Sequence, residues 1–209
     1  MHDDILYRTS NWGGQVEKVF ENENIGLCGV IGTHVQMKGV SGHWNSCVTS
    51  GYVMTKNPVT NKYSEKKYDD VLSSDDVEVV SVDGLWMCIP HRVFKYIRWD
   101  ERTFKGFHCY DADIYMQVQH HNKKVVGLKN IAIEHHAVAN FNTDFYESEK
   151  LWAEKWNDYL PMVRGIDVIG MHRLYMKERV AHRSVLDSKA FKLGTFLLNP
   201  FYKLKKLIK

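Results

Sequence analysis

The sequence contains no long apolar run, no paired cysteine motif and no strong excess of one charge. No uninterrupted apolar stretch approaches the ~20 residues that a membrane-spanning helix requires, and no signal-peptide pattern is visible. The formal net charge of +3 favours neither a nucleic acid nor a membrane as a partner. The four cysteines are scattered without C-x-x-C spacing, which predicts reduced thiols in a cytoplasmic protein rather than disulfides or a zinc site.

The composition is that of an ordinary globular protein. Hydrophobic residues make up 44% and charged residues 25% of the 209 positions, which suits one domain with a short appendage. We expect a folded domain over residues 1–160 and a helical, basic amphipathic tail over residues 161–209. The tail is expected either to dock on its own domain or to contact an anionic membrane surface at the inner face of the membrane.

Short apolar segments alternate with amphipathic segments along the proposed domain. Apolar runs that are rich in β-branched residues predict strands over residues 25–32, 77–82 and 124–133. Amphipathic patterns predict helices over residues 90–94, from Asp113 to about Asn122, and over residues 145–180. A strand, a helix and a strand of these lengths indicate an α/β sandwich.

The first polar motif lies at the very start of the sequence, where Met1 is followed by His2-Asp3-Asp4. Carboxylates clustered with a histidine suit a hard divalent cation. Such a triplet normally lies at the end of a strand that earlier structure supports, and here no earlier structure precedes it. We therefore expect either a frayed terminus or the later part of a larger catalytic domain.

Three further polar groups follow strands or open a helix. Asp83-Gly84 forms a predicted turn, Asp111-Ala112-Asp113 precedes a helix, and Glu134-His135-His136 ends a strand. Acidic residues are favoured in a first helical turn by capping and by the helix dipole, so plain capping is an alternative to catalysis for Asp111. Either His135 or His136 would be the functional histidine, and a strand-end histidine can also be purely structural.

Five segments, taken in order, resemble glycosyltransferase family 2, and more narrowly the branch related to the StrF proteins of streptomycin biosynthesis. They are His2–Asp4, Val82–Met87, Phe107–Asp113, Ile131–His135 and Lys155-Trp156. The similarity spans roughly residues 1–160. It implies a GT-A fold, which is a Rossmann-like α/β domain, and it implies nucleotide-sugar donors, a saccharide or lipid-linked saccharide acceptor, and Mg²⁺ or Mn²⁺ as cofactor.

The resemblance also implies a role for each matching residue. His2 and Asp4 fall where the family has its metal triplet, and His135 would close the metal site from a later strand. The acidic position that serves as base in inverting members is matched by Asp111. The turn near donor sugar and acceptor is matched by Asp83 and Gly84, since glycine permits close backbone approach.

Asp113, on the same turn as Asp111, is assigned to the donor and acceptor region, where it would cap the helix or orient a partner.

A departure from the family pattern concerns the N-terminal half. A GT-A domain begins with strand-helix-strand units, ~30 residues each, that hold the nucleotide before the metal triplet. These units are missing here, so the resemblance implies an N-terminally truncated, partial GT-A domain.

Three functions are consistent with these patterns. The first is a metal-dependent inverting glycosyltransferase. The second is a catalytically inactive remnant or an acceptor-binding partner module. The third is a metal-dependent phosphohydrolase built on the histidines and Asp4, which leaves Asp83-Gly84 and Asp111 without a role. The sequence favours the first.

Overall fold

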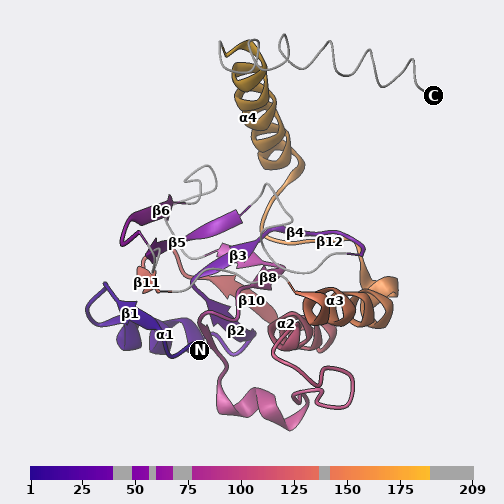
Figure 1. The fold of residues 1–209 in the computed structure, drawn as a ribbon. Coiled ribbons are helices and arrows are strands. Elements are labelled where there is room, and N and C mark those ends of the chain that lie inside the picture. Colours follow the sequence, from indigo (N-terminus) through magenta and orange to yellow (C-terminus); the bar gives the residue numbers. More distant parts are fainter. Residues whose placement is uncertain (40–48, 57–59, 68–76, 137–141, 189–209) are drawn as a thin grey trace, which may run out of the picture. The chain divides into compact units, whose positions relative to one another are not determined.

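The computed structural model describes residues 1–39, 49–56, 60–67, 77–136 and 142–188. The chain divides into two compact units, Met1–Ile166 and Asp167–Lys209. The first unit is a mixed α/β domain (Figure 1). The basic segment from Lys189 onward, on which the predicted membrane contact depends, lies outside the described residues. Among the helices of the described ranges, none combines the length and the apolar character needed to cross a membrane.

Within the described residues, one sheet has its strands in the order β1-β11-β5-β3-β8, with β6 paired to β5. The bounds are Ile5–Tyr7 for β1, Ile133–His135 for β11, Thr49–Lys56 for β5, Ile31–Thr33 for β3, Ser81–Val82 for β8 and Tyr63–Lys67 for β6. The pair that matters for the site is β1 with β11, which is antiparallel and sets Ile5 opposite His135. This register places the N-terminal segment beside the segment that ends at His135.

A second sheet of the described structure has the order β7-β10-β2-β9. Its strands are Val77–Val79 (β7), Lys124–Gly127 (β10), Ile25–Gly29 (β2) and Met87–Cys88 (β9). β10 and β2 are parallel, whereas β7 and β9 are antiparallel to their neighbours. A small third sheet pairs β4 (Val35–Gln36) with β12 (Met162–Val163).

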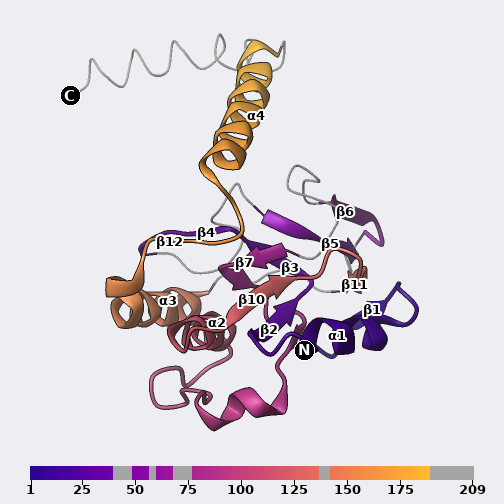
Figure 2. The same ribbon diagram turned by 180° about the vertical axis from the view of Figure 1, so that it is seen from behind.

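The second sheet is buried on both faces by helices. The helices of the first unit are α1 (Trp12–Phe20), the 3₁₀ segment His91–Lys95, α2 (Tyr110–His120), α3 (Thr143–Trp156) and the 3₁₀ segment Asn157–Tyr159. α2 and α3 lie side by side (Figures 1 and 2). They pack with Leu27 and Val125 in one core, whereas α1 packs with Cys28 and Val126 in the other. Neighbouring residues thus enter opposite cores, as the alternation of a strand requires.

The α/β class agrees with the prediction, but the predicted strands are divided. Residues 77–82 form β7 and β8, residues 25–32 form β2 and β3, and residues 124–133 contain β10 and only the start of β11. In each case the chain leaves one sheet and enters another. An apolar run reports burial but not the partner of each residue, so the run conceals this change of sheet.

The predicted helix over residues 145–180 is also wrong in extent. α3 begins after Asn142, whose side chain accepts a hydrogen bond from the Phe145 backbone N–H at 3.0 Å, and it ends at Trp156. Pro161 then lacks the N–H that a continuing helix needs. The chain forms β12 and begins a new helix, α4 (Val168–Asp187), which belongs to the second unit.

Candidate active site

The N-terminal triplet is held in the fold by backbone hydrogen bonds. The His2 N–H donates to the Leu85 carbonyl at 2.9 Å, and the His136 N–H donates to the Asp4 carbonyl at 3.0 Å. β1 then continues from Ile5 along β11. The triplet is therefore not a frayed terminus in this structure, because two distant segments fix its position.

Three predicted ligand residues lie together at this point. His2 Nδ1 is 3.3 Å from His135 Nε2, which in turn is 3.4 Å from Asp4 Oδ1. The remaining distance, from His2 Nδ1 to Asp4 Oδ1, is 3.8 Å. Ligands that each lie about 2.1 Å from one ion are roughly 3.0–3.4 Å apart, so the spacing is close to that of a small divalent cation site.

The donor set also has the chemistry of a cation site. Asp4 Oδ1 is buried and has no hydrogen-bond partner within the described structure, which is costly for a carboxylate oxygen unless a cation is near. Burial lowers the pKa of His135, and neighbouring His2 lowers it further, although Asp4 opposes both effects. The lowered pKa favours the neutral imidazole, which is the form that binds a metal. The residues present fit a divalent metal ion.

His136 points to a different partner. Its Nε2 lies 2.6 Å from Glu134 Oε1, and Glu134 Oε2 accepts a hydrogen bond from Arg8 Nε at 2.7 Å. Glu134 is buried, and burial alone would raise its pKa, but the hydrogen bonds from Arg8 and His136 lower the pKa below its usual value. This ionic cluster ties β1 to β11. Of the two candidate histidines, His135 is the one that lies with His2 and Asp4.

Asp111 lies in the first turn of α2, next to the predicted Asp83-Gly84 turn. The N-cap position of α2 is Cys109, which has a left-handed φ of 62°, so Asp111 is not the N-cap residue. Its Oδ2 accepts a hydrogen bond from the Gly84 N–H at 2.9 Å, and its Oδ1 accepts one from the Ala112 N–H at 2.8 Å. The structure therefore joins two motifs that lie 27 residues apart in the sequence.

Gly84 permits this close approach. A Cβ at this position would lie 2.7 Å from Tyr110 Oη and 3.0 Å from the Asp111 carboxylate. These contacts are too short for any larger residue. The preceding Asp83 accepts a hydrogen bond from the Leu85 N–H at 2.7 Å and thereby closes the turn.

The environment of Asp111 suits a base that works near neutral pH. Burial, followed by the nearby Asp83 carboxylate, raises the pKa of Asp111 to about 6, although hydrogen bonds from Ala112 and Gly84 act in the opposite direction. A general base is most effective when its pKa lies near the working pH.

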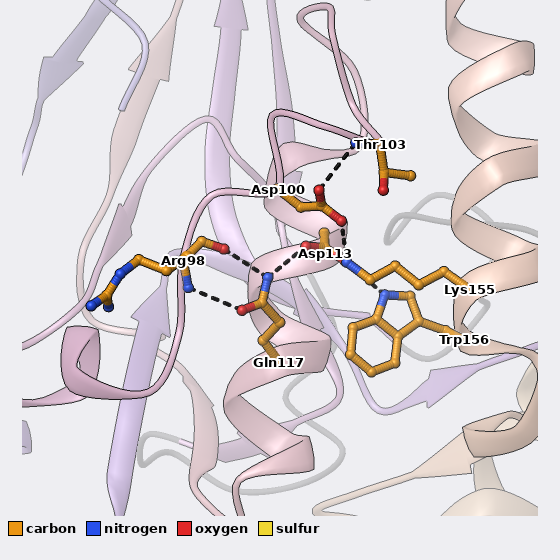
Figure 3. Close-up of polar contacts among 7 residues, drawn as sticks. All are labelled: Arg98, Asp100, Thr103, Asp113, Gln117, Lys155 and Trp156. Atoms are coloured by element: carbon orange, nitrogen blue, oxygen red, sulfur yellow. Dashed lines mark hydrogen bonds and ion pairs between the residues drawn. The ribbon is translucent and has the colours of Figure 1, made fainter.

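Asp113 is directed away from Asp111 and into the protein. It is 1% exposed. Its Oδ1 lies 2.9 Å from Trp156 Nε1 and 2.7 Å from Lys155 Nζ, and its Oδ2 accepts a hydrogen bond from Gln117 at 2.6 Å (Figure 3). The side chain does not cap α2, contrary to one of the two expectations for it. It orients Lys155, Trp156 and Gln117 instead.

Sequence reasoning missed two members of this network. Asp100 Oδ2 binds the Lys155 ammonium at 2.7 Å, and Gln117 binds both backbone groups of Arg98 (Figure 3). The sequence singles out Asp113, Lys155 and Trp156, which lie in two of the five segments that resemble glycosyltransferase family 2. A lone Asp in a loop and a Gln in a helix have no distinctive pattern, so only the folded structure identifies them.

Comparison with known proteins identifies a family for most of the sequence. Residues 1–155 match the model of a glycosyltransferase-like family, and this range contains the His2–Asp4–His135 group as well as Asp111. No curated protein matches the chain. The match covers well over half of the sequence, and the chain belongs to this glycosyltransferase-like family.

Proposed function

We propose that the protein is a metal-dependent, inverting glycosyltransferase that moves a sugar from a nucleotide-sugar donor to a hydroxyl of a saccharide or related acceptor. The observation that carries the proposal is the meeting of His2, Asp4 and His135, where Asp4 Oδ1 is buried without a hydrogen-bond partner in the described structure. A transferase of this kind needs positive charge beside the leaving diphosphate, and this group is suited to hold it.

In this proposal, His2, Asp4 and His135 hold Mg²⁺ or Mn²⁺, which when bound offsets the negative charge of the departing nucleoside diphosphate. The neutral form of His135 keeps its nitrogen lone pair available. The hydrogen bond from the His2 N–H to the Leu85 carbonyl and the one from the His136 N–H to the Asp4 carbonyl fix the backbone of the triplet, so the ligand atoms require little rearrangement.

Asp111 acts as the general base. It accepts the proton of the acceptor hydroxyl while that oxygen bonds to the anomeric carbon and the bond from that carbon to the diphosphate oxygen breaks. A pKa of about 6 leaves the carboxylate mostly ionised at pH 7. The Gly84 and Ala112 N–H groups hold the carboxylate in one orientation, and we assign the donor sugar's hydroxyls to Asp83.

The decisive experiment is a thermal melt with Mn²⁺ and a panel of nucleoside diphosphates. A ligand at 100 times its Kd stabilises the native state by about 2.7 kcal/mol, which would raise Tm by roughly 5–10 °C. We expect a shift that needs both Mn²⁺ and one nucleotide, and Asp4→Asn should abolish most of it. An Asp3→Asn variant is the control, since Asp3 is not part of the three-residue ligand group.

The melt, together with an assay for phosphate release, separates the proposal from its rivals. A cooperative melt that no nucleotide shifts would contradict the transferase and support an acceptor-binding module. Metal-dependent release of phosphate from a generic ester, without sugar transfer, would support a phosphohydrolase.

A further inference from the structure

A groove of about 690 Å³ lies beside the candidate active site. Its lining includes Trp99, Phe104, Phe107 and Tyr110. Tyr110 directly precedes Asp111, and its hydroxyl lies 3.5 Å from the Gly84 carbonyl. Through Tyr110, the groove adjoins the residues to which the proposed function gives the base and the donor turn.

Aromatic rings connect the groove to the candidate metal ligands. The His2 ring centroid is 5.6 Å from that of Phe107, which is 5.8 Å from that of Tyr110, and Tyr110 is 6.0 Å from Trp99. Phe107 is 66% exposed and Trp99 is 44% exposed. Exposed aromatic side chains that line a hollow are typical of ligand sites, where an apolar surface awaits a partner.

The charges along the groove restrict the class of ligand. Its ionisable side chains include Asp100 and Glu101, and the residues lining it in the described structure include no Lys, Arg or His. Lys155 balances the charge of Asp100, but the exposed Glu101 carboxylate disfavours an anionic ligand, whereas hydroxyl groups can donate hydrogen bonds to it. Flat apolar rings beside carboxylates that accept hydrogen bonds are complementary to a neutral sugar, which has both C–H faces and hydroxyl groups.

The wall of the groove is held rigidly. Trp99 lies between Arg98, whose two backbone groups are bound by Gln117, and Asp100, whose carboxylate is bound by Lys155 and by the Thr103 N–H (Figure 3). Both neighbours of Trp99 are thus tied to α2 and α3. A preformed wall reduces the entropy that a weakly held ligand must lose on binding.

From these observations we infer that the groove is the acceptor site and that the acceptor presents a neutral saccharide, stacked on Trp99 and Phe107 with a hydroxyl directed to Asp111. The inference rests on the proposed function for the role of Asp111. The aromatic groove itself makes a prediction about binding that can be measured without any donor.

The test is saturation-transfer NMR and calorimetry with the methyl glycosides of glucose, galactose, rhamnose and N-acetylglucosamine, in the absence of nucleotide. We expect at least one glycoside to bind. Trp99→Ala should weaken its binding at least tenfold and Trp99→Phe by less. Tyr146→Ala is the matched control, since Tyr146 is 60% exposed but does not line this groove. A thermal melt of each variant verifies that it is folded.

The outcomes separate this inference from the proposed function. If Mn²⁺ and a nucleotide shift the melt but no glycoside binds, the inference fails and the transferase proposal stands. If a glycoside binds but no nucleotide shifts the melt, the saccharide-binding groove is supported and the transferase proposal fails. The inference is also overturned if Trp99→Ala binds as tightly as the wild type, or if sugar phosphates bind more tightly than the neutral glycosides.

Discussion

At the scale of single residues, the site combines two carboxylates with different environments. Asp4 has a buried oxygen without a hydrogen bond in the described structure, so it suits a cation. Asp111 has two backbone donors, but its burial and then the nearby Asp83 carboxylate make its charge costly. Environments that separate two carboxylates in this way assign them different chemical roles.

Asp111→Asn should therefore reduce sugar transfer by about 10²–10⁴-fold, because the amide cannot accept the acceptor proton. Nucleotide binding should be unchanged. In the wild type, the rate should rise as pH increases through about 6, as the base ionises. Initial rates over pH 5–8 measure both effects, and retained turnover in the variant would remove Asp111 from the role of base.

The same substitution should increase stability at neutral pH. Asp111 has a folded pKa of about 6, above its ordinary value of 3.8, so the folded state binds more protons and wild-type stability falls as pH rises from about 4 to 6. Asn carries no charge and avoids this loss, which amounts to at most about 3 kcal/mol. Urea melts at pH 4 and pH 8 check this: a gain at pH 8 alone is expected, and equal gains would contradict it.

At the scale of elements, the site depends on contacts between a turn and a helix. The Asp83-Gly84 turn fits against the first turn of α2 because Gly84 has no side chain. On the other side of α2, Lys155 and Trp156 of α3 converge on Asp113. The helix is thus positioned from both sides, and Asp111 moves if either contact is lost.

Gly84→Ala tests the first contact. The new Cβ would overlap Tyr110 Oη and press on the Asp111 carboxylate, so we expect a loss of about 1–3 kcal/mol in stability and a large loss of transfer. Gly13→Ala is the control, because no atom lies within 4 Å of its added Cβ and alanine favours a helix. Equal activity of both variants would show that the approach of the turn to α2 is unimportant.

Lys155→Met tests the second contact. The substitution leaves the buried Asp113 carboxylate without its cation and should cost roughly 3 kcal/mol. Lys150→Met on the exposed face of α3 should cost less than about 1 kcal/mol. Denaturant melts at pH 7 compare the two variants, and similar costs would argue against a structural role for the Lys155 pair.

The pH dependence of the wild type measures the second ion pair of Lys155, the one with Asp100. Burial would raise the pKa of Asp100, but hydrogen bonds from Lys155 and Thr103 outweigh it and lower the pKa to about 2. Its stabilisation is complete above about 4 and is lost as pH falls toward 2. This acid-induced loss should be smaller in Lys155→Met.

At the scale of the whole chain, the segment up to Gly165 is integrated into the first unit. β12 pairs with β4, and the Arg164 N–H donates to the His34 carbonyl at 3.0 Å. Gly165 has a left-handed φ of 65°, and a Cβ there would lie 1.8 Å from the Glu78 carbonyl oxygen. The first unit therefore includes residues beyond the predicted boundary at 160.

A protein that ends at Ile166 should consequently fold by itself. A thermal melt monitored by circular dichroism should show one cooperative transition. We expect its Tm to lie within a few degrees of the corresponding transition in the whole chain. A protein that ends at Leu160 lacks β12 and should be less stable. Equal melting of both truncated forms would contradict a structural role for β12.

The sequence by itself indicated the α/β class, the candidate carboxylate and histidine residues, and a helix that begins near the start of α3. These features depend on local chemistry: apolar runs mark buried strands, amphipathic periodicity marks a helix, and carboxylates and histidines are recognisable ligands. The resemblance added the glycosyltransferase family, which the match over residues 1–155 supports.

Only the tertiary structure decided which of two histidines joins Asp4, where Asp113 points and which sheet each strand enters. His135 and His136 are adjacent in sequence, but a strand directs successive side chains to opposite faces. Asp113 lies two residues from Asp111, and on a helix this separation turns it toward α3. Such choices depend on register and on contacts between residues more than 100 positions apart, which no local pattern contains.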